Sequence, residues 1–164
     1  MRSIVLIAHN LRSTHNVGSL LRTAEGLGLE KVILTGYTPY PTITNDSRLP
    51  HEAAKLQKQI EKTALGAEMT QSWEQSEEVM PIIDQLISEG YTVAALEQTP
   101  TAIKLPDFKV PDKIALIVGR EVEGLESEVL ARCQLALEIP MFGHKESFNV
   151  VQAAAMALYH CRFP

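Results

Sequence analysis

The fold is decided by two stretches in the last third of the chain, Ile117-Val-Gly-Arg-Glu-Val-Glu-Gly-Leu125 and Ile139-Pro-Met-Phe-Gly-His-Lys-Glu-Ser-Phe-Asn149. Each stretch follows an apolar run and leads into a segment of helical character. A polar, glycine-bearing loop at the end of a buried strand is where open α/β sheets bind ligands. A third polar stretch, Asn16-Val-Gly-Ser-Leu-Leu-Arg22, also follows an apolar run. The three stretches together predict one composite site.

The rest of the chain alternates between strand-like and helix-like runs. Strands are expected at residues 4–8, 31–35, 91–96, 113–118 and 135–139, and helices at residues 17–28, 51–62, 76–89, 125–133 and 149–159. Several of the strand runs are continuously apolar and lack in–out alternation, which is typical of strands buried on both faces. The pattern therefore predicts an α/β fold with a mostly parallel sheet and helices on both faces.

Other segments are less regular. Residues 38–50 are rich in Pro, Thr and Asn and are expected to form a loop, and residues 98–111 contain three prolines and are expected to be irregular. Residues 69–73 are expected to form a short strand, and Pro81 is expected to limit the first part of its helix. No linker, repeat or low-complexity tract divides the sequence, so we expect one domain over residues 1–164.

Composition restricts the class of protein. The 164 residues have the apolar content of a globular domain, and no apolar run is long enough to cross a bilayer. The apolar start of the chain is short and is followed directly by a helical pattern, so we interpret it as a first strand and not as a signal peptide. Cys133 and Cys161 have no paired spacing, which favours reduced thiols and a cytoplasmic protein. The net charge of −5 predicts that any nucleic acid is bound by a local basic patch.

The two glycine loops have structural as well as functional interpretations. The loop from Gly119 to Gly124 matches neither the dinucleotide fingerprint nor the phosphate loop, and a plain strand-to-helix turn is an equally good interpretation. Ser147 and Asn149 flank a helix start, where such residues are usually N-caps. The presence of both, with Phe148 between them, favours a pocket with an apolar wall and hydrogen-bonding partners. Arg22 is either a solvated side chain or a clamp for a phosphate or carboxylate.

The three stretches in this order resemble the SpoU–TrmH family of RNA ribose 2′-O-methyltransferases, within the SPOUT superfamily. The resemblance covers nearly the whole chain, and Lys62-Thr-Ala-Leu-Gly-Ala67 resembles a stretch that lies between the first two motifs. Val151-Gln152 departs from the family pattern, and Gln152 is a candidate contact with the ligand or a partner subunit. The matching residues are Asn16, Gly18 and Arg22, then Gly119, Glu121, Gly124 and Leu125, then Ile139, Pro140, Met141, Gly143, Ser147, Phe148, Asn149 and Val150.

The resemblance implies a fold, a cofactor and an assembly. The fold is SPOUT-type, with a deep trefoil knot in the C-terminal third, and the protein is a homodimer whose sites lie at the subunit interface. The cofactor is S-adenosyl-L-methionine, and the substrate is RNA, with tRNA favoured over rRNA. The resemblance implies that the cofactor is bound by Leu96, Gly119, Ile139, Met141, Ser147 and Phe148, and that catalysis depends on Arg22, Glu121, Ser147, Asn149 and Asn16.

Within this family Arg22 is the usual activator of the ribose hydroxyl. A guanidinium does not readily release its proton, so we expect Arg22 to orient the phosphate and to stabilise the developing alkoxide. No metal is implied, because the five histidines show no ligand spacing, and His9 is expected to be a surface or packing residue. The sequence predicts RNA contacts from Arg12, Arg22, Lys55, Lys58, Lys62 and Lys145.

Two other functions are compatible with the sequence. One is a non-catalytic RNA-binding or assembly protein that keeps the fold and the pocket. The presence of Arg22, Glu121, Ser147 and Asn149 disfavours it. The other is a dinucleotide-dependent oxidoreductase, which is disfavoured because the first strand lacks a glycine-rich turn.

Overall fold

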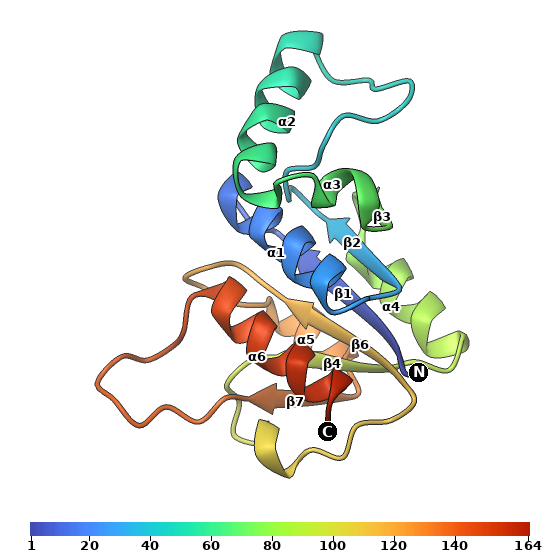
Figure 1. The fold of residues 1–164 in the computed structure, drawn as a ribbon. Helices are drawn as coiled ribbons and strands as arrows, with labels where there is room; N and C mark the ends of the chain where they lie inside the picture. Colours follow the sequence, from blue (N-terminus) through green and yellow to red (C-terminus); the bar gives the residue numbers. More distant parts are fainter.

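The structure is a computed structural model that describes residues 1–164. Seven strands form one sheet in the order β3-β2-β1-β6-β4-β7-β5 (Figure 1). Every neighbouring pair is parallel, which confirms the predicted parallel α/β sheet. The strands are β1 (Ser3–His9), β2 (Lys31–Thr35), β3 (Trp73–Ser76), β4 (Thr92–Leu96), β5 (Ile103–Lys104), β6 (Lys113–Val118) and β7 (Leu135–Glu138).

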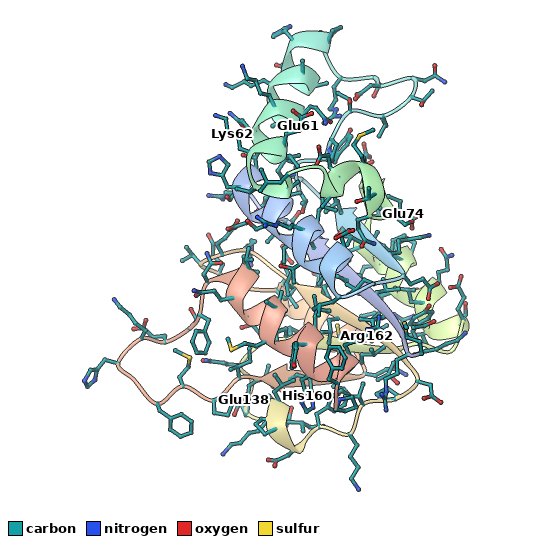
Figure 2. The ribbon with its side chains drawn as sticks, viewed as in Figure 1. Glu61, Lys62, Glu74, Glu138, His160 and Arg162 are labelled. Carbon is teal, nitrogen blue, oxygen red and sulfur yellow. The ribbon has the colours of Figure 1, made fainter.

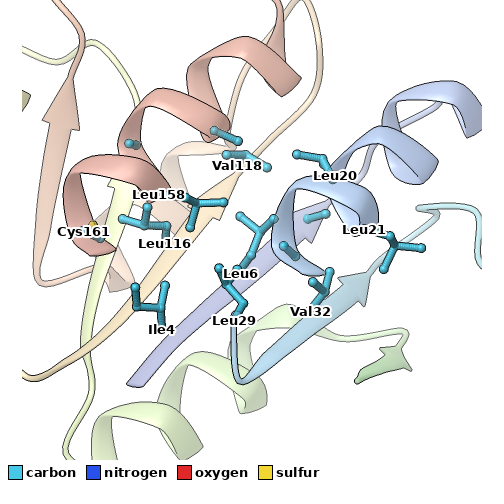
Figure 3. Packing of buried hydrophobic residues seen from close by; sticks show 14 of the residues in the cluster. Ile4, Leu6, Leu20, Leu21, Leu29, Val32, Leu116, Val118, Leu158 and Cys161 are labelled. Atoms are coloured by element: carbon cyan, nitrogen blue, oxygen red, sulfur yellow. The ribbon is translucent and has the colours of Figure 1, made fainter. Parts of the chain in front are cut away.

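Helices cover both faces of this sheet, as the apolar strands predict. On one face, α1 and α6 pack over β1, β2 and β6; Figure 3 shows Leu20 and Leu21 of α1 and Leu158 of α6 in this layer. On the other face, α4 and α5 pack against the alternate side chains of the same strands. The helices are α1 (Thr14–Gly26), α2 (Pro50–Ala64), α3 (Ala67–Thr70), α4 (Val79–Ser88), α5 (Ser127–Arg132) and α6 (Val150–Arg162), with one 3₁₀ turn, η1 (Leu105–Asp107).

Helix α2 extends beyond the sheet and is joined to the rest of the molecule through α1 (Figure 1). The joint depends on Gly18, because a Cβ atom there would lie 2.2 Å from the Thr63 hydroxyl and 2.4 Å from the Ile60 carbonyl oxygen. The Thr63 hydroxyl donates a hydrogen bond to the His15 carbonyl oxygen (2.8 Å). Gly18 therefore allows α1 and α2 to pack closely. Thr63, which lies in the stretch 62–67 that resembles the family, contacts α1 at this point.

Two predicted segments differ from the structure. Residues 69–73 are not a strand: Ala67–Thr70 is a short helix, and strand β3 begins only at Trp73. Leu65 and Gly66 both have positive φ, which turns the chain sharply into α3, and Met69 then points into solvent. β3 is polar because it lies at the edge of the sheet, so apolar content did not mark it. The region predicted as irregular contains β5, a two-residue strand paired with β7.

The remaining expectations about the fold have mixed outcomes. Pro81 lies in the first turn of α4, where it removes no helical hydrogen bond. Cys133 and Cys161 are unpaired, and burial raises the pKa of each thiol to about 11. No helix has the length and apolar character needed to cross a membrane. The trefoil knot stays a prediction, because strand order and pairing define the sheet and not the threading of its loops.

Candidate active site

A cavity of about 270 Å³ opens where β4, β6 and β7 end. Its walls are the residues that follow these strands, together with the start of α6. Because the strands are parallel, their carboxyl ends meet at one edge of the sheet, which is where ligands bind in open α/β folds. The cavity is lined by all six residues predicted to bind the cofactor, Leu96, Gly119, Ile139, Met141, Ser147 and Phe148.

The loop after β6 is a closed turn. The backbone N–H groups of Arg120 and Gly124 each donate to the other residue's carbonyl oxygen, at 3.2 and 3.1 Å, and the Arg120 Nε donates to the Gly124 carbonyl oxygen at 3.0 Å. Gly124 has a φ of +70°, which favours glycine. A Cβ atom at Gly119 would lie 2.8 Å from the Leu125 side chain and from the Gly124 backbone. Both glycines are therefore required for the shape of this wall.

The two residues that directly follow β4, Glu97 and Gln98, connect this strand to the loops after β6 and β7. The Glu97 carboxylate accepts a hydrogen bond from the Leu125 backbone N–H (3.0 Å), and the Gln98 side-chain amide donates to the Glu146 carbonyl oxygen (2.8 Å). Glu97 thus fixes the loop after β6, and Gln98 fixes the loop after β7. Of the residues at the end of β4, only Leu96 was expected to belong to the site. The signal that was available was a polar pair directly after a buried strand.

The Glu121 carboxylate joins the cavity to the start of α1. It accepts hydrogen bonds from the backbone N–H groups of Arg12 (3.3 Å) and Ser13 (3.2 Å), and from the Asn16 side-chain amide (3.4 Å). A carboxylate at a helix N-terminus is also favoured by the helix dipole. Of the predicted catalytic residues, Asn16 and Glu121 are therefore in direct contact, although they are 105 positions apart in the chain.

The other three predicted catalytic residues have different positions. Ser147 lines the cavity and is exposed. Asn149 is the N-cap of α6, and its side-chain oxygen accepts a hydrogen bond from the Val151 backbone N–H (2.9 Å). Arg22 lies on the exposed side of α1, does not line the cavity, and makes no hydrogen bond or ion pair within the chain. A single chain therefore brings residues of all three predicted site segments together, but it leaves Arg22 outside the cavity.

A buried polar group behind the cavity was not expected. His9 is only 6% exposed; its Nδ1 lies 2.9 Å from the Thr35 hydroxyl, and its Nε2 lies 3.3 Å from a Glu126 carboxylate oxygen. The Asn10 side-chain amide donates to the same carboxylate (2.9 Å), and Arg120 lies 3.8 Å from it. His9 packs in the structure as expected, but it is also part of a polar network that joins β1 to the start of α5.

This network affects the protonation of its members. Burial lowers the pKa of His9 below its ordinary value, and the attraction of Glu126 offsets only part of this effect. Burial alone would raise the pKa of Glu126. Hydrogen bonds from its own backbone N–H and from Asn10, with the charges of His9 and Arg120, bring its pKa below the ordinary value instead. The folded protein therefore favours a neutral imidazole beside an ionised carboxylate.

The cavity is strongly acidic. Five glutamates line it, against a single arginine. Apolar side chains such as Leu96, Ile139 and Phe148 alternate with them. Such a lining suits a ligand with an apolar body and a positive charge. The acidic residues are Glu97, Glu121, Glu123, Glu138 and Glu146. No group of three or more His, Cys, Asp or Glu side chains is placed to bind a metal ion.

The fold and the site define the class of this protein: a parallel α/β domain with a ligand cavity formed by the loops after its central strands. Residues 3–159 match the model of the SpoU rRNA Methylase family, and the chain belongs to that family. Residues carrying the resemblance lie in this cavity and at the start of α1.

Curated relatives extend the match over nearly the whole chain. A tRNA (guanosine(18)-2′-O)-methyltransferase of Borreliella burgdorferi is 26% identical over 95% of this chain and 64% of its own length. A putative TrmH family tRNA/rRNA methyltransferase of Staphylococcus haemolyticus is 29% identical over 96% of this chain and 57% of its own length. The chain thus spans about three fifths of the length of these relatives.

Solved structures share the fold. The A. aeolicus TrmH/SpoU tRNA modifying enzyme superposes with a TM-score of 0.80 at 18% identity, over 99% of this chain and 75% of that one. An AdoMet-bound rRNA methyltransferase from Sinorhizobium meliloti superposes with a TM-score of 0.80 at 19% identity, over 99% of this chain and 57% of that one. A structure described for 2-OH methylation of C/U34 on tRNA superposes with a TM-score of 0.76 at 22% identity, over 98% of this chain and 94% of that one. These likenesses establish the SpoU/TrmH architecture.

Proposed function

We propose that this protein is an RNA ribose 2′-O-methyltransferase that uses S-adenosyl-L-methionine. The observation that carries the proposal is the acidic cavity, which gathers the ends of three strands and all six residues expected to bind the cofactor. Family membership and the AdoMet-bound methyltransferase with the same fold support it.

The residues of the cavity fit this cofactor. Gly119 and Gly124 allow the loop after β6 to pack closely against Leu125 and Glu97, where a Cβ atom would clash, and this packing gives the cavity wall its shape. The apolar side chains suit the faces of an adenine, and the glutamates suit a sulfonium and an ammonium group. The bound cofactor would supply an electrophilic methyl group on its sulfonium.

Each site residue then has a distinct part. Glu121 and Asn16 fix the start of α1 against the loop after β6 (residues 119–124, the cofactor loop), so that RNA on α1 is placed relative to the methyl donor. Ser147 is exposed at the cavity wall and is available to the ribose. Asn149 sets the direction of α6 as its N-cap. Arg22 orients the phosphate next to the target and stabilises the alkoxide.

The position of Arg22 supports a homodimer with shared sites. Within one subunit Arg22 is exposed and outside the cavity, so the proposed role requires Arg22 of the partner subunit. Helix α6 has exposed apolar side chains suited to an interface: Met156, Tyr159 and, just after the helix, Phe163. Sedimentation at micromolar concentration is expected to give a dimer, and a monomer that still transfers methyl groups would exclude the shared site.

The RNA surface is proposed to include helix α2. Lys55, Lys58 and Lys62 recur at helical spacing on one side of it, opposite the buried Ala53 and Ile60. All three lysines are exposed and none forms an ion pair. Figure 2 shows Lys62 on the side of α2 toward which the loop after β7 also extends. Free lysines in a row suit the phosphates of an RNA backbone.

Among RNA substrates we favour tRNA, which would place the reaction in the cytoplasm. The similar structure described for methylation of tRNA at C/U34 is matched over 94% of its length, so it is nearly the size of this chain. An rRNA substrate is the second candidate, supported by the S. meliloti enzyme of the same fold.

Titration calorimetry and a transfer assay test the proposal. Calorimetry is expected to detect S-adenosyl-L-methionine and its demethylated product, and not NAD. Transfer of labelled methyl to tRNA and rRNA fractions, followed by mapping of 2′-O-methylation, identifies the substrate. Cofactor binding without transfer to either RNA would favour the non-catalytic RNA-binding protein. Binding of NAD alone would favour the oxidoreductase.

A further inference from the structure

A second hollow, of about 430 Å³, lies beside the candidate active site. It is located where β1 and β2 end and is bordered by helix α2 through Leu56. Its side chains differ in kind from those of the acidic cavity. They include two arginines and two tyrosines, Arg12, Arg48, Tyr37 and Tyr40, and no carboxylate.

The backbone presents Tyr37 to solvent in a defined position. Gly36 has a φ of +65°, and a Cβ atom there would lie 1.9 Å from the Asn10 side-chain oxygen. That same oxygen accepts a hydrogen bond from the Tyr37 backbone N–H (3.0 Å). The next residue, Thr38, is buried and bonded to the backbone of Ala8 and Leu11. Tyr37 is therefore fixed at its backbone, while the residue as a whole is 52% exposed.

The two arginines have different states. The Arg48 guanidinium stacks 3.6 Å from the centroid of the Tyr40 ring, and its nitrogens donate to Asp46 and to the carbonyl oxygens of Tyr40 and Pro41. Because its guanidinium nitrogens already donate hydrogen bonds within the chain, Arg48 borders the hollow as a structural residue and is not available to bind a phosphate. The Arg12 side chain is exposed and makes no bond, so Arg12 is the free cation of this hollow.

The hollow is tied to the candidate active site. The Arg12 backbone N–H donates to Glu121, and Asn10, which positions Tyr37, also donates to Glu126 directly after the cofactor loop. A ligand in the hollow would therefore be a near neighbour of a ribose at the cavity. Single-stranded RNA is recognised by stacking of unpaired bases on aromatic rings, with arginine beside them.

We propose that this hollow binds an unstacked RNA base, on the ring of Tyr37, with Arg12 on the adjoining phosphate. The base belongs to the target nucleotide or to its immediate neighbour. The inference rests on the proposed function, because an RNA substrate must lie across the cavity. It adds a base subsite to an enzyme whose reaction involves only the ribose.

The test uses a 12-nucleotide RNA of mixed sequence with 2-aminopurine near its centre, because the fluorescence of that base reports stacking. The wild-type protein and Tyr37→Phe are expected to quench the fluorescence on binding. Tyr37→Ala is expected to remove the quenching and to weaken binding about 5- to 150-fold, the range for one stacked base. Arg12→Gln is expected to weaken binding while quenching at saturation remains.

The controls separate this inference from the proposed function. Met69→Ala removes an exposed apolar side chain on α3, outside the hollow, and should change neither affinity nor quenching. Calorimetry with S-adenosyl-L-methionine on Tyr37→Ala checks that the cofactor cavity is intact. Unchanged quenching and affinity in Tyr37→Ala, with wild-type methyl transfer demonstrated, would overturn the base subsite alone. Absence of methyl transfer by the wild type would instead refute the proposed function.

Discussion

Residues 1–64 and residues 65–164 carry opposite net charge, and each part provides one of the two hollows at the same edge of one sheet. The first part has eight lysines and arginines against five acidic residues, whereas the second has seven against fifteen. The first part presents the lysine row of α2 and the hollow at Tyr37. The second presents the loops with the five glutamates of the cavity. Net charge alone, at −5, conceals this division.

The division corresponds to the charges of the two proposed ligands. RNA is a polyanion, whereas the methyl donor carries a sulfonium, so each part has the sign that attracts its own ligand. The parts meet where Glu121 accepts hydrogen bonds from Arg12 and Ser13. Variants in one part are therefore expected to impair one binding step and to leave the other intact.

The largest expected effect is that of Arg22→Ala. Arg22 belongs to the RNA part and does not line the cofactor cavity, so cofactor affinity should stay near the wild-type value. Loss of an electrostatic contact made mainly in the transition state should lower the rate of methyl transfer about a hundredfold or more. Arg22→Lys should recover little, because lysine lacks the planar fork. Single-turnover kinetics measure the rate of methyl transfer, and calorimetry measures the cofactor affinity. Loss of cofactor affinity in Arg22→Ala would show that Arg22 acts with the cofactor-binding part of the chain and not with the RNA-binding part.

Next in size is Gly119→Ala, which changes the cofactor part alone. The added methyl group would meet Leu125 and the Gly124 backbone at 2.8 Å, so the loop after β6 must move. Cofactor affinity should fall about tenfold or more, while RNA affinity in the absence of cofactor should be unchanged. Gly143→Ala is the matched control, since its Cβ atom would have no neighbour within 4 Å. Equal effects of the two variants would show that the Gly119 turn is not required.

The two parts also differ in how well the sequence predicts them. The cofactor loops follow continuous apolar strands, so their position at the sheet edge was predictable, and all six named residues line one cavity. The composite site was only partly predictable. The contact between Asn16 and Glu121 brings two of the predicted motifs together, as expected. The position of Arg22 outside the cavity depends on how α1 packs against the sheet, and the sequence motif does not specify this packing.

Other residues escaped prediction for physical reasons. Glu97 and Gln98 act through single hydrogen bonds to backbone groups of distant loops, and such partners leave no periodic signal. His9 looked like a packing residue because its partners, Thr35 and Glu126, are 26 and 117 positions away in the chain. The edge strand β3 was misplaced because it has too few buried positions to show a pattern.

A smaller effect is expected from the lysine row. The triple variant Lys55→Gln, Lys58→Gln and Lys62→Gln should weaken RNA binding at low salt and reduce the slope of log affinity against log salt by about 2 to 3. Cofactor affinity should not change. The matched control is Lys104→Gln, Lys109→Gln and Lys113→Gln, which removes the same charge from the other part. Equal slopes for the two triple variants would show that the charge division does not direct RNA binding.

The smallest effect concerns the junction of the two parts, where His9 of β1 meets Glu126 before α5. Burial lowers the pKa of His9 in the folded state, so the imidazole takes up protons less readily there than in the unfolded chain. Stability is therefore full above the unfolded pKa of about 6.5 and falls as the pH drops from there toward the folded pKa. Glu126 acts in a separate window. Its folded pKa is lowered too, so its contribution is lost only below its unfolded value of 4.5.

Thermal unfolding between pH 7.5 and 5 thus separates the contribution of His9 from that of Glu126, and comparison with His9→Gln separates it from those of the other histidines. His9→Gln should lower the Tm at every pH, because the contact with Thr35 is altered, but it should also flatten the decline of the Tm toward pH 5. The decline of the Tm between pH 7.5 and pH 5 is expected to be smaller in His9→Gln than in the wild type. Parallel profiles for the two proteins would mean that His9 titrates as it does in the unfolded chain. The junction would then join the two parts by packing and hydrogen bonds, with no dependence on the protonation of His9.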